Sequence, residues 1–73
     1  MTNLEFYQGE IDLLPTIRKK INYLNRAKVE LEYRVEHMKS FKWFMGELVR
    51  PSQVVANRDE LKTVNQLLNQ LKP

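Results

Sequence analysis

The sequence predicts an all-α protein, in which a short N-terminal helix precedes a long central helix and a C-terminal helix folds back antiparallel, as a helical hairpin or three-helix bundle. The 73 residues include only two glycines and three prolines, which leaves little turn chemistry for a β fold. Apolar residues recur every seven positions through the central region, as in coiled coils. Because so short a chain builds one small core, we expect a single domain over residues 1–73.

The first helix is expected over residues 3–11. Thr2 and Glu5 have the spacing of a capping box, in which the threonine side chain accepts the amide of Glu5 and the glutamate reaches back to the amide of Thr2. Gly9 is expected to weaken or end this helix, since glycine is a poor helix former.

The central helix is expected over residues 13–49, with Asp12 as its N-cap and Pro15 in its first turn. Pro51 disfavours the α conformation at the residue before it and so predicts the helix end. Lys28 and Lys42 interrupt the seven-residue pattern, and they either extend past apolar neighbours to solvent or set the register of a dimer. The apolar positions are Leu14, Ile21, Val35 and Val49 in one column, and Ile17, Leu24, Leu31, Met38 and Met45 in the other.

A connector over residues 50–57 and a third helix over residues 58–71 complete the prediction. Asn57 offers a side-chain cap, and two acidic residues follow in the first turn. Within the connector, Val54 and Val55 are expected to fold onto the core. The apolar face of the third helix comprises Leu61, Val64, Leu68 and Leu71.

The expected lengths leave part of the central seam uncovered. A helix from residue 14 to residue 49 would be roughly 54 Å long, whereas the third helix would reach roughly 23 Å. We therefore expect some of the seam to accept either a second copy of the chain or a foreign protein.

Composition argues against an enzyme and against cofactors or metals. The chain has no cysteine and one histidine, His37, without Asp, Glu or His at metal-ligand spacing, so His37 is interpreted as structural. The N-terminus lacks a basic segment followed by an apolar one, and no apolar run reaches membrane-spanning length. We expect a cytoplasmic protein that does not enter membranes.

A basic stretch predicts one binding face. Residues 16–28 contain five basic residues and no acidic one, and on a helix several of them share a side that could contact phosphates and base edges. The alternative interpretation is a solvated face, or a partner for the acidic first helix. The candidate nucleic-acid-binding residues are Arg18, Lys19, Asn22, Arg26 and Lys28.

An aromatic cluster predicts a second binding face. On a continuous helix Phe41, Phe44, Met45 and Leu48 would share the core face, while Trp43 would point to the opposite, charged side. Such a tryptophan would serve as a protein-binding anchor, or would be covered by the connector or by the Phe6-Tyr7 pair. Of that pair, one ring is expected to be exposed. The candidate protein-binding residues are Trp43, Phe44, Phe6, Tyr7, Lys39, Lys42 and Arg50.

In size, helical hairpin, mixed-charge surface and outlying Trp43, the whole chain resembles the small bacteriophage regulators that bind host RNA polymerase. The resemblance implies binding to the large polymerase subunits in the host cytoplasm, inhibition of initiation by interference with sigma factor engagement, and an effect on termination. A non-enzymatic protein-binding regulator is therefore the leading hypothesis. The alternatives are a basic helical nucleic-acid-binding module and a helical homodimer with a structural or adaptor role.

Overall fold

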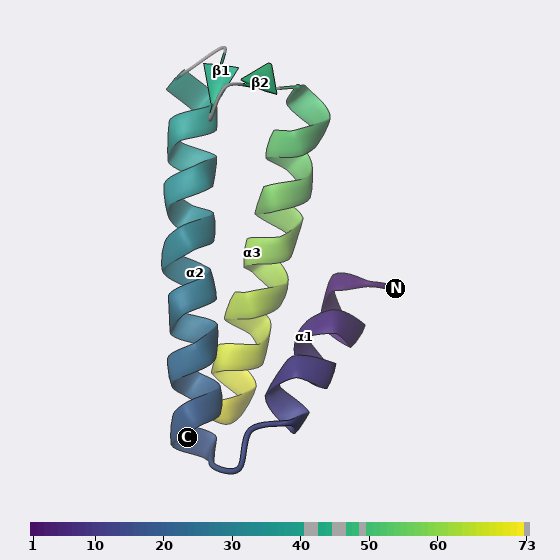
Figure 1. Cartoon of the computed structure of the whole chain (residues 1–73), viewed down its shortest axis with the longest axis vertical. Helices are drawn as coiled ribbons and strands as arrows, with labels where there is room; N and C mark the ends of the chain where they lie inside the picture. The colour runs from purple at the N-terminus through teal and green to yellow at the C-terminus, as the bar shows by residue number, and fades with distance from the viewer. Residues whose placement is uncertain (41–42, 45–46, 49, 73) are drawn as a thin grey trace.

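The computed structural model describes residues 1–40, 43–44, 47–48 and 50–72, with side-chain environments for 1–38 and 50–72. It contains helices α1 (Asn3–Asp12), α2 (Ile17–Ser40) and α3 (Pro51–Leu71). Helices α2 and α3 lie side by side and antiparallel, and α1 lies beside the lower half of the pair (Figure 1). This confirms the all-α fold and the antiparallel return of the C-terminal helix. The molecule measures 40 × 22 × 20 Å.

The core runs between α2 and α3 and is closed on one side by α1. Leu24 and Val64 are fully buried at its centre, which confirms the predicted seam over this part of α2. Ile17, at the start of the seam, stays 60% exposed, because α3 ends nearby and leaves it uncovered. The buried core residues are Tyr7, Ile11, Leu24, Leu31, Val35, Val64, Leu67 and Leu68.

Helix α1 begins at the predicted capping box. The Glu5 amide donates to Thr2 Oγ1 at 3.1 Å, and the Thr2 amide donates to Glu5 Oε1 at 3.4 Å. The helix continues through Gly9 to Asp12, one residue beyond the predicted 3–11, so Gly9 does not end it. Tyr7 and Ile11 lie one turn apart on either side of Gly9, and both are buried. Burying both requires an unbroken helix between them.

Helices α1 and α2 are separate, and the break lies further along the chain than predicted. Asp12 is the last residue of α1 rather than the N-cap of the next helix. Thr16 takes that role: the Lys19 amide donates to Thr16 Oγ1 at 3.2 Å, and the Lys20 amide donates to the Thr16 carbonyl at 3.1 Å. Pro15 favours this arrangement, because its ring keeps the preceding residue out of the α conformation.

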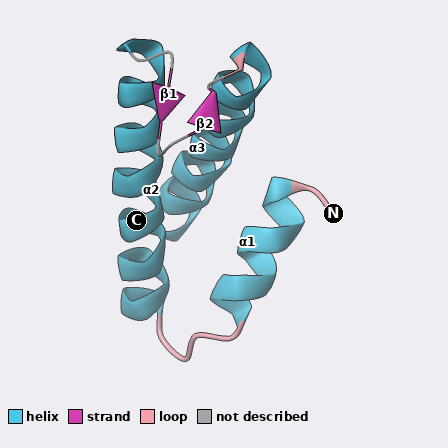
Figure 2. Cartoon of the chain, turned by 45° about the horizontal axis from the view of Figure 1, so that its top comes forward, coloured by secondary structure: helices cyan, strands magenta, loops and turns pink. Residues whose placement is uncertain are grey.

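The central helix is shorter than the predicted 13–49. It ends at Ser40, and the chain then forms the two-residue strands β1 (Trp43–Phe44) and β2 (Glu47–Leu48). The strands are antiparallel, with Trp43 opposite Leu48 and Phe44 opposite Glu47. They lie at the tip of the α2–α3 hairpin (Figure 2). The seam positions Lys42, Met45 and Val49, like Phe41, lie outside the described residues.

Helix α3 begins at Pro51, so the predicted connector over 50–57 is instead the first part of this helix. Proline is favoured in the first helical turn, where its missing N–H has no partner to lose. The Arg50 amide donates to Gln53 Oε1 at 2.8 Å, which satisfies one free donor at the helix start. Val54 is half-buried as predicted, but Val55 is 56% exposed, because helical geometry turns it away from the core.

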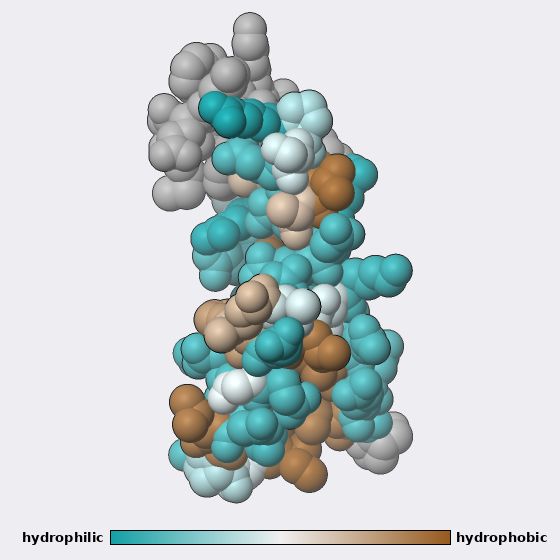
Figure 3. Space-filling model, turned by 90° about the vertical axis from the view of Figure 1, so that its right-hand side faces the viewer, coloured by the Kyte–Doolittle hydropathy of each residue, from teal (hydrophilic) through white to brown (hydrophobic). Residues whose placement is uncertain are grey.

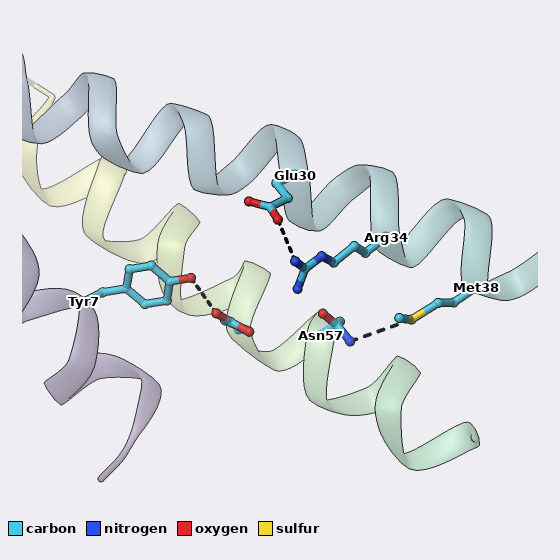
Figure 4. Close-up of polar contacts among 6 residues, drawn as sticks. Tyr7, Glu30, Arg34, Met38 and Asn57 are labelled. Atoms are coloured by element: carbon cyan, nitrogen blue, oxygen red, sulfur yellow. Dashed lines mark hydrogen bonds and ion pairs between the residues drawn. The ribbon is translucent and has the colours of Figure 1, made fainter. Parts of the chain in front are cut away.

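Asn57, the predicted cap, lies inside α3 and contacts α2. Its Nδ2 donates to the Gln53 carbonyl at 2.7 Å and lies 3.7 Å from the sulfur of Met38 (Figure 4). An amide at this position satisfies its donor locally while its side chain fills the space between the helices. The predicted apolar face of α3 is confirmed further along: Val64 and Leu68 are buried, and Leu61 and Leu71 pack against them.

Candidate protein-binding surfaces

The candidate protein-binding residues fall on two parts of the molecule. Trp43 and Phe44 form β1 at the hairpin tip, and Arg50 directly precedes α3 at the same end. Lys39 belongs to the last turn of α2, and Lys42 lies outside the described residues. The expectation that Trp43 faces the charged side of a helix no longer applies, because residues 43–44 form a strand. Phe6 and Tyr7 belong to α1 instead.

Phe6 and Tyr7 differ sharply in exposure, as the adjacency of the two rings predicted. The Phe6 side chain is 45% exposed, whereas that of Tyr7 is 5% exposed. The rings meet edge to face with centroids 5.2 Å apart, and Tyr7 also approaches Tyr23 at 6.4 Å. Tyr7 is therefore a core residue, and its expected role at a protein-binding surface is corrected by its burial.

The Tyr7 hydroxyl joins α1 to α3. It donates to Glu60 Oε1 at 2.5 Å (Figure 4). Burial, followed by the hydrogen bond to Glu60 and the charge of that carboxylate, raises the pKa of Tyr7. Burial and the charges of Glu10 and Glu60 likewise raise the pKa of Tyr23. Both phenols thus favour their protonated form in the folded chain.

The outer side of α1 combines apolar and acidic side chains. Leu4 and Phe6 are each 45% exposed, and Leu13, just beyond the helix, is 81% exposed. Residues 1–12 carry three acidic side chains and no basic one. On the side of the molecule that α1 covers, apolar side chains interrupt the polar surface in the lower half (Figure 3). This surface suits a partner that offers apolar pockets with basic residues around them.

The predicted basic face is present on α2. Arg18, Lys19, Asn22 and Arg26 are exposed, while Lys28 is half-buried beside the seam. The half-buried lysine follows from its seam position, where the stem packs beside apolar neighbours. The first four side chains are available to solvent or to a charged partner, whereas Lys28 is partly covered.

The sequence interpretation missed an apolar patch that follows this basic face along α2. Val29 is 67% exposed and Tyr33 is 55% exposed. The Tyr33 ring stacks on His37 with centroids 3.8 Å apart, and His37 Nδ1 lies 2.8 Å from the Tyr33 carbonyl oxygen. A shallow hollow lies on this face and is lined by Asn25, Arg26, Val29, Glu30 and Tyr33. The i, i+4 spacing of Val29 and Tyr33, off the main seam, is the signal that could have revealed it.

A surface ion pair borders the hollow. Arg34 Nη2 lies 2.6 Å from Glu30 Oε1, one turn earlier on α2 (Figure 4). Both side chains are substantially exposed, so the pair adds little to stability, about 0.3–0.5 kcal/mol. Its effect is to hold the Glu30 carboxylate along the helix.

A second shallow hollow, also not predicted, runs along α3. Amide side chains dominate it, with two basic residues at one end. Such a surface offers many hydrogen-bond donors and acceptors beside a larger exposed apolar area. The lining residues are Arg58, Leu61, Lys62, Asn65, Gln66, Asn69 and Gln70.

Within the described ranges, no group of three His, Asp or Glu side chains is placed to hold a metal ion. None of the helices in this part of the chain is both long and apolar enough to cross a membrane. Compared with protein-family models, curated proteins and solved structures, the chain finds no match in any of the three.

Proposed function

We propose that the chain is a non-enzymatic regulator of the host cytoplasm that binds RNA polymerase and inhibits transcription initiation by interfering with sigma factor engagement. An effect on termination belongs to the same proposal. The choice of target rests on the resemblance of the whole chain to small bacteriophage regulators. The protein-binding class has separate support from the arrangement of the elements.

The observation that carries this proposal is the composition of the hairpin tip. The aromatic pair Trp43-Phe44 occupies β1, between the end of α2 and the start of α3. Lys39 lies in the last turn of α2, and the exposed Arg50 directly precedes α3. Aromatic residues with arginine and lysine around them are the residue types that dominate protein interfaces and orient them toward acidic targets.

The slender shape of the molecule supports the proposed mechanism. A rod 40 Å long and about half as wide presents its tip ahead of its body, so the tip can enter a groove on a much larger protein. There it would occupy surface that sigma factor needs. The exposed Phe6 on α1 would add a second contact on the side of the rod.

The proposal is tested with purified bacterial RNA polymerase. The labelled chain is titrated with core enzyme and with holoenzyme, and run-off transcription from a promoter is measured in parallel. We expect binding to core enzyme, competition with sigma factor and loss of run-off product. Trp43→Ala should weaken binding at least about tenfold, as expected for loss of an aromatic anchor.

Ile17→Ala is the matched control, because Ile17 is exposed at the start of α2, at the end of the molecule opposite the tip. It should bind like the wild type. Circular dichroism establishes that both variants keep the helical fold. The proposal fails if the wild type does not bind polymerase, and the role of Trp43 fails if both variants bind equally.

The basic face of α2 favours the second candidate, a nucleic-acid-binding module, since four of its five predicted residues are exposed. That function requires affinity for duplex DNA that falls with salt, with a slope of about −0.9 for each phosphate neutralised. Arg18→Ala and Arg26→Ala should each reduce that slope. Binding to polymerase that is unchanged after nuclease treatment would oppose this candidate.

A further inference from the structure

The face of α2 that points away from α3 carries a second seven-residue pattern. Lys19, Arg26 and Tyr33 form one column at seven-residue spacing, and Asn22, Val29 and Glu36 form the other. All six side chains are exposed, whereas Leu24, Leu31 and Val35 are buried on the opposite side of the helix. Alternating spacings of three and four residues are those of a coiled-coil seam. This outer seam is not covered by α1 or α3.

Charge along the outer seam changes sign. The apolar centre of the outer seam is Val29 and Tyr33. Before this centre lie Lys19 and Arg26, in a segment with five basic and no acidic residues. Beyond the centre lies Glu36, so Arg26 and Glu36 carry opposite charges on the two sides of Val29 and Tyr33. Glu30 and Glu32 flank the centre itself, where Arg34 pairs with Glu30 of the same chain. A helix with this polarity is complementary to a second copy of itself in the antiparallel direction, because Arg26 of each copy then meets Glu36 of the other.

We propose that two copies of the chain associate through this face, with their α2 helices antiparallel. In the register that centres the apolar patch on the two-fold axis, Val29 packs against Tyr33 of the second copy. Arg26 then lies opposite Glu36 of the second copy. Each contact occurs twice, as a two-fold interface requires.

The hollow on this face fits the same register. Four of its lining residues, Arg26, Val29, Glu30 and Tyr33, have the i, i+3, i+4, i+7 spacing of the hole that receives a side chain in coiled-coil packing. The residue of the second copy that faces the centre of this hole is Tyr33. Its half-exposed ring has the size and the polar tip expected of an interface residue.

This association uses a different surface from the hairpin tip, so it does not depend on the proposed binding of polymerase. The buried area of two crossing helices is small, which predicts weak and concentration-dependent dimerisation. Low salt strengthens it, because its charges are exposed.

Analytical ultracentrifugation of the full chain tests the proposal at low ionic strength, up to about 500 μM, where a small interface is populated. We expect the wild type to approach the mass of a dimer. Arg26→Glu and Glu36→Arg should each weaken association at least about tenfold, because each places like charges opposite one another twice. The double variant Arg26→Glu/Glu36→Arg should restore it.

Arg58→Glu is the matched control, since it makes the same charge change on an exposed position of α3 and should associate like the wild type. Circular dichroism confirms that every variant is folded. A wild type that stays monomeric over the whole range overturns the proposal. So does a double variant no better than the single ones, or a control that loses association as they do.

Discussion

The Tyr7 hydroxyl donates to the Glu60 carboxylate at 2.5 Å, and this hydrogen bond joins residues 53 positions apart in the chain. It is the polar counterpart of the apolar contact by which α1 lies on the hairpin. A phenol is well suited to this place, because its ring enters the core while its hydroxyl reaches a carboxylate at the edge. The bond requires the protonated phenol, which makes the contact sensitive to alkaline pH.

We expect the folded chain to lose stability as pH rises above 10. The pKa of Tyr7 is raised from its ordinary value of 10.0, chiefly by burial and then by Glu60. Above pH 10 the unfolded chain loses the phenol proton while the folded chain keeps it, so the free energy of unfolding falls as pH rises. Below pH 10 this contribution is fully present. Urea unfolding between neutral and alkaline pH measures it.

Tyr7→Phe is the control for the alkaline effect. At neutral pH the free energy of unfolding of the variant should be lower than that of the wild type by about 0.5–1.5 kcal/mol, the usual net value of one hydrogen bond. Its alkaline loss should be smaller than that of the wild type but not absent, because the pKa of Tyr23 is also raised. An unchanged pH dependence in this variant would contradict the assignment to Tyr7.

Leu24→Ala should destabilise the chain by about 2–5 kcal/mol, because it deletes buried methyl groups and leaves a cavity. Leu24 has no exposed surface and lies where α2 meets the rest of the core. Thermal unfolding followed by circular dichroism gives the change. Val29→Ala, on the same helix but 67% exposed, should alter stability by no more than about 0.5 kcal/mol. Similar losses in the two variants would show that the core is not placed as described.

Gly9→Ala should stabilise the chain by up to about 1 kcal/mol, because alanine is the better helix former and restricts the unfolded chain more. Gly9 lies inside α1, and an added Cβ would meet no atom within 4 Å. Chemical unfolding of the two proteins in parallel provides the measurement. A loss of stability would mean that the helix does not continue through Gly9.

Thr16→Ala should cost about 0.5–2 kcal/mol, the value of a lost helix N-cap. The Thr16 hydroxyl accepts the Lys19 amide at the start of α2. Thr63→Ala is the matched control: its hydroxyl bonds only back to the Asp59 carbonyl within α3, so this change should be nearly neutral. If instead Asp12→Ala proved costly and Thr16→Ala neutral, the predicted cap would have been the correct one.

The sequence predicted those parts of the fold that depend on interactions between residues close together in the chain. The capping box at Thr2 and Glu5 fixes the start of α1, and the spacing of Leu24 and Leu31 identifies the buried side of α2. In both cases neighbouring residues supply the interaction or share one helix face. The start of α3 was missed because a proline both ends one helix and begins another, and Pro51 does the second.

Candidate surfaces were harder to predict, since exposure depends on which helices pack together. Tyr7 and Phe6 are adjacent and chemically similar, and only the position of α3 decides that Tyr7 is buried. The assignment of Trp43 to a charged helix face depended on a helix that ends at Ser40. Four of the five residues predicted for the basic face of α2 are exposed together, because they lie on one uninterrupted helix. The neighbouring Val29 and Tyr33 were overlooked because the seven-residue pattern of the main seam already accounted for most apolar residues of α2.

Helix α1 contacts the rest of the molecule through few buried side chains, so it is expected to open more readily than the α2–α3 pair. Its buried side chains are Tyr7 and Ile11, whereas α2 and α3 share a long interface between segments joined by a short hairpin. The hairpin can therefore assemble first, and α1 can detach and return without global unfolding. The amide hydrogens of α1 should exchange with solvent sooner than those around Leu24 and Val64. The chain then behaves as a stable pair of helices, α2 and α3, from which α1 dissociates locally.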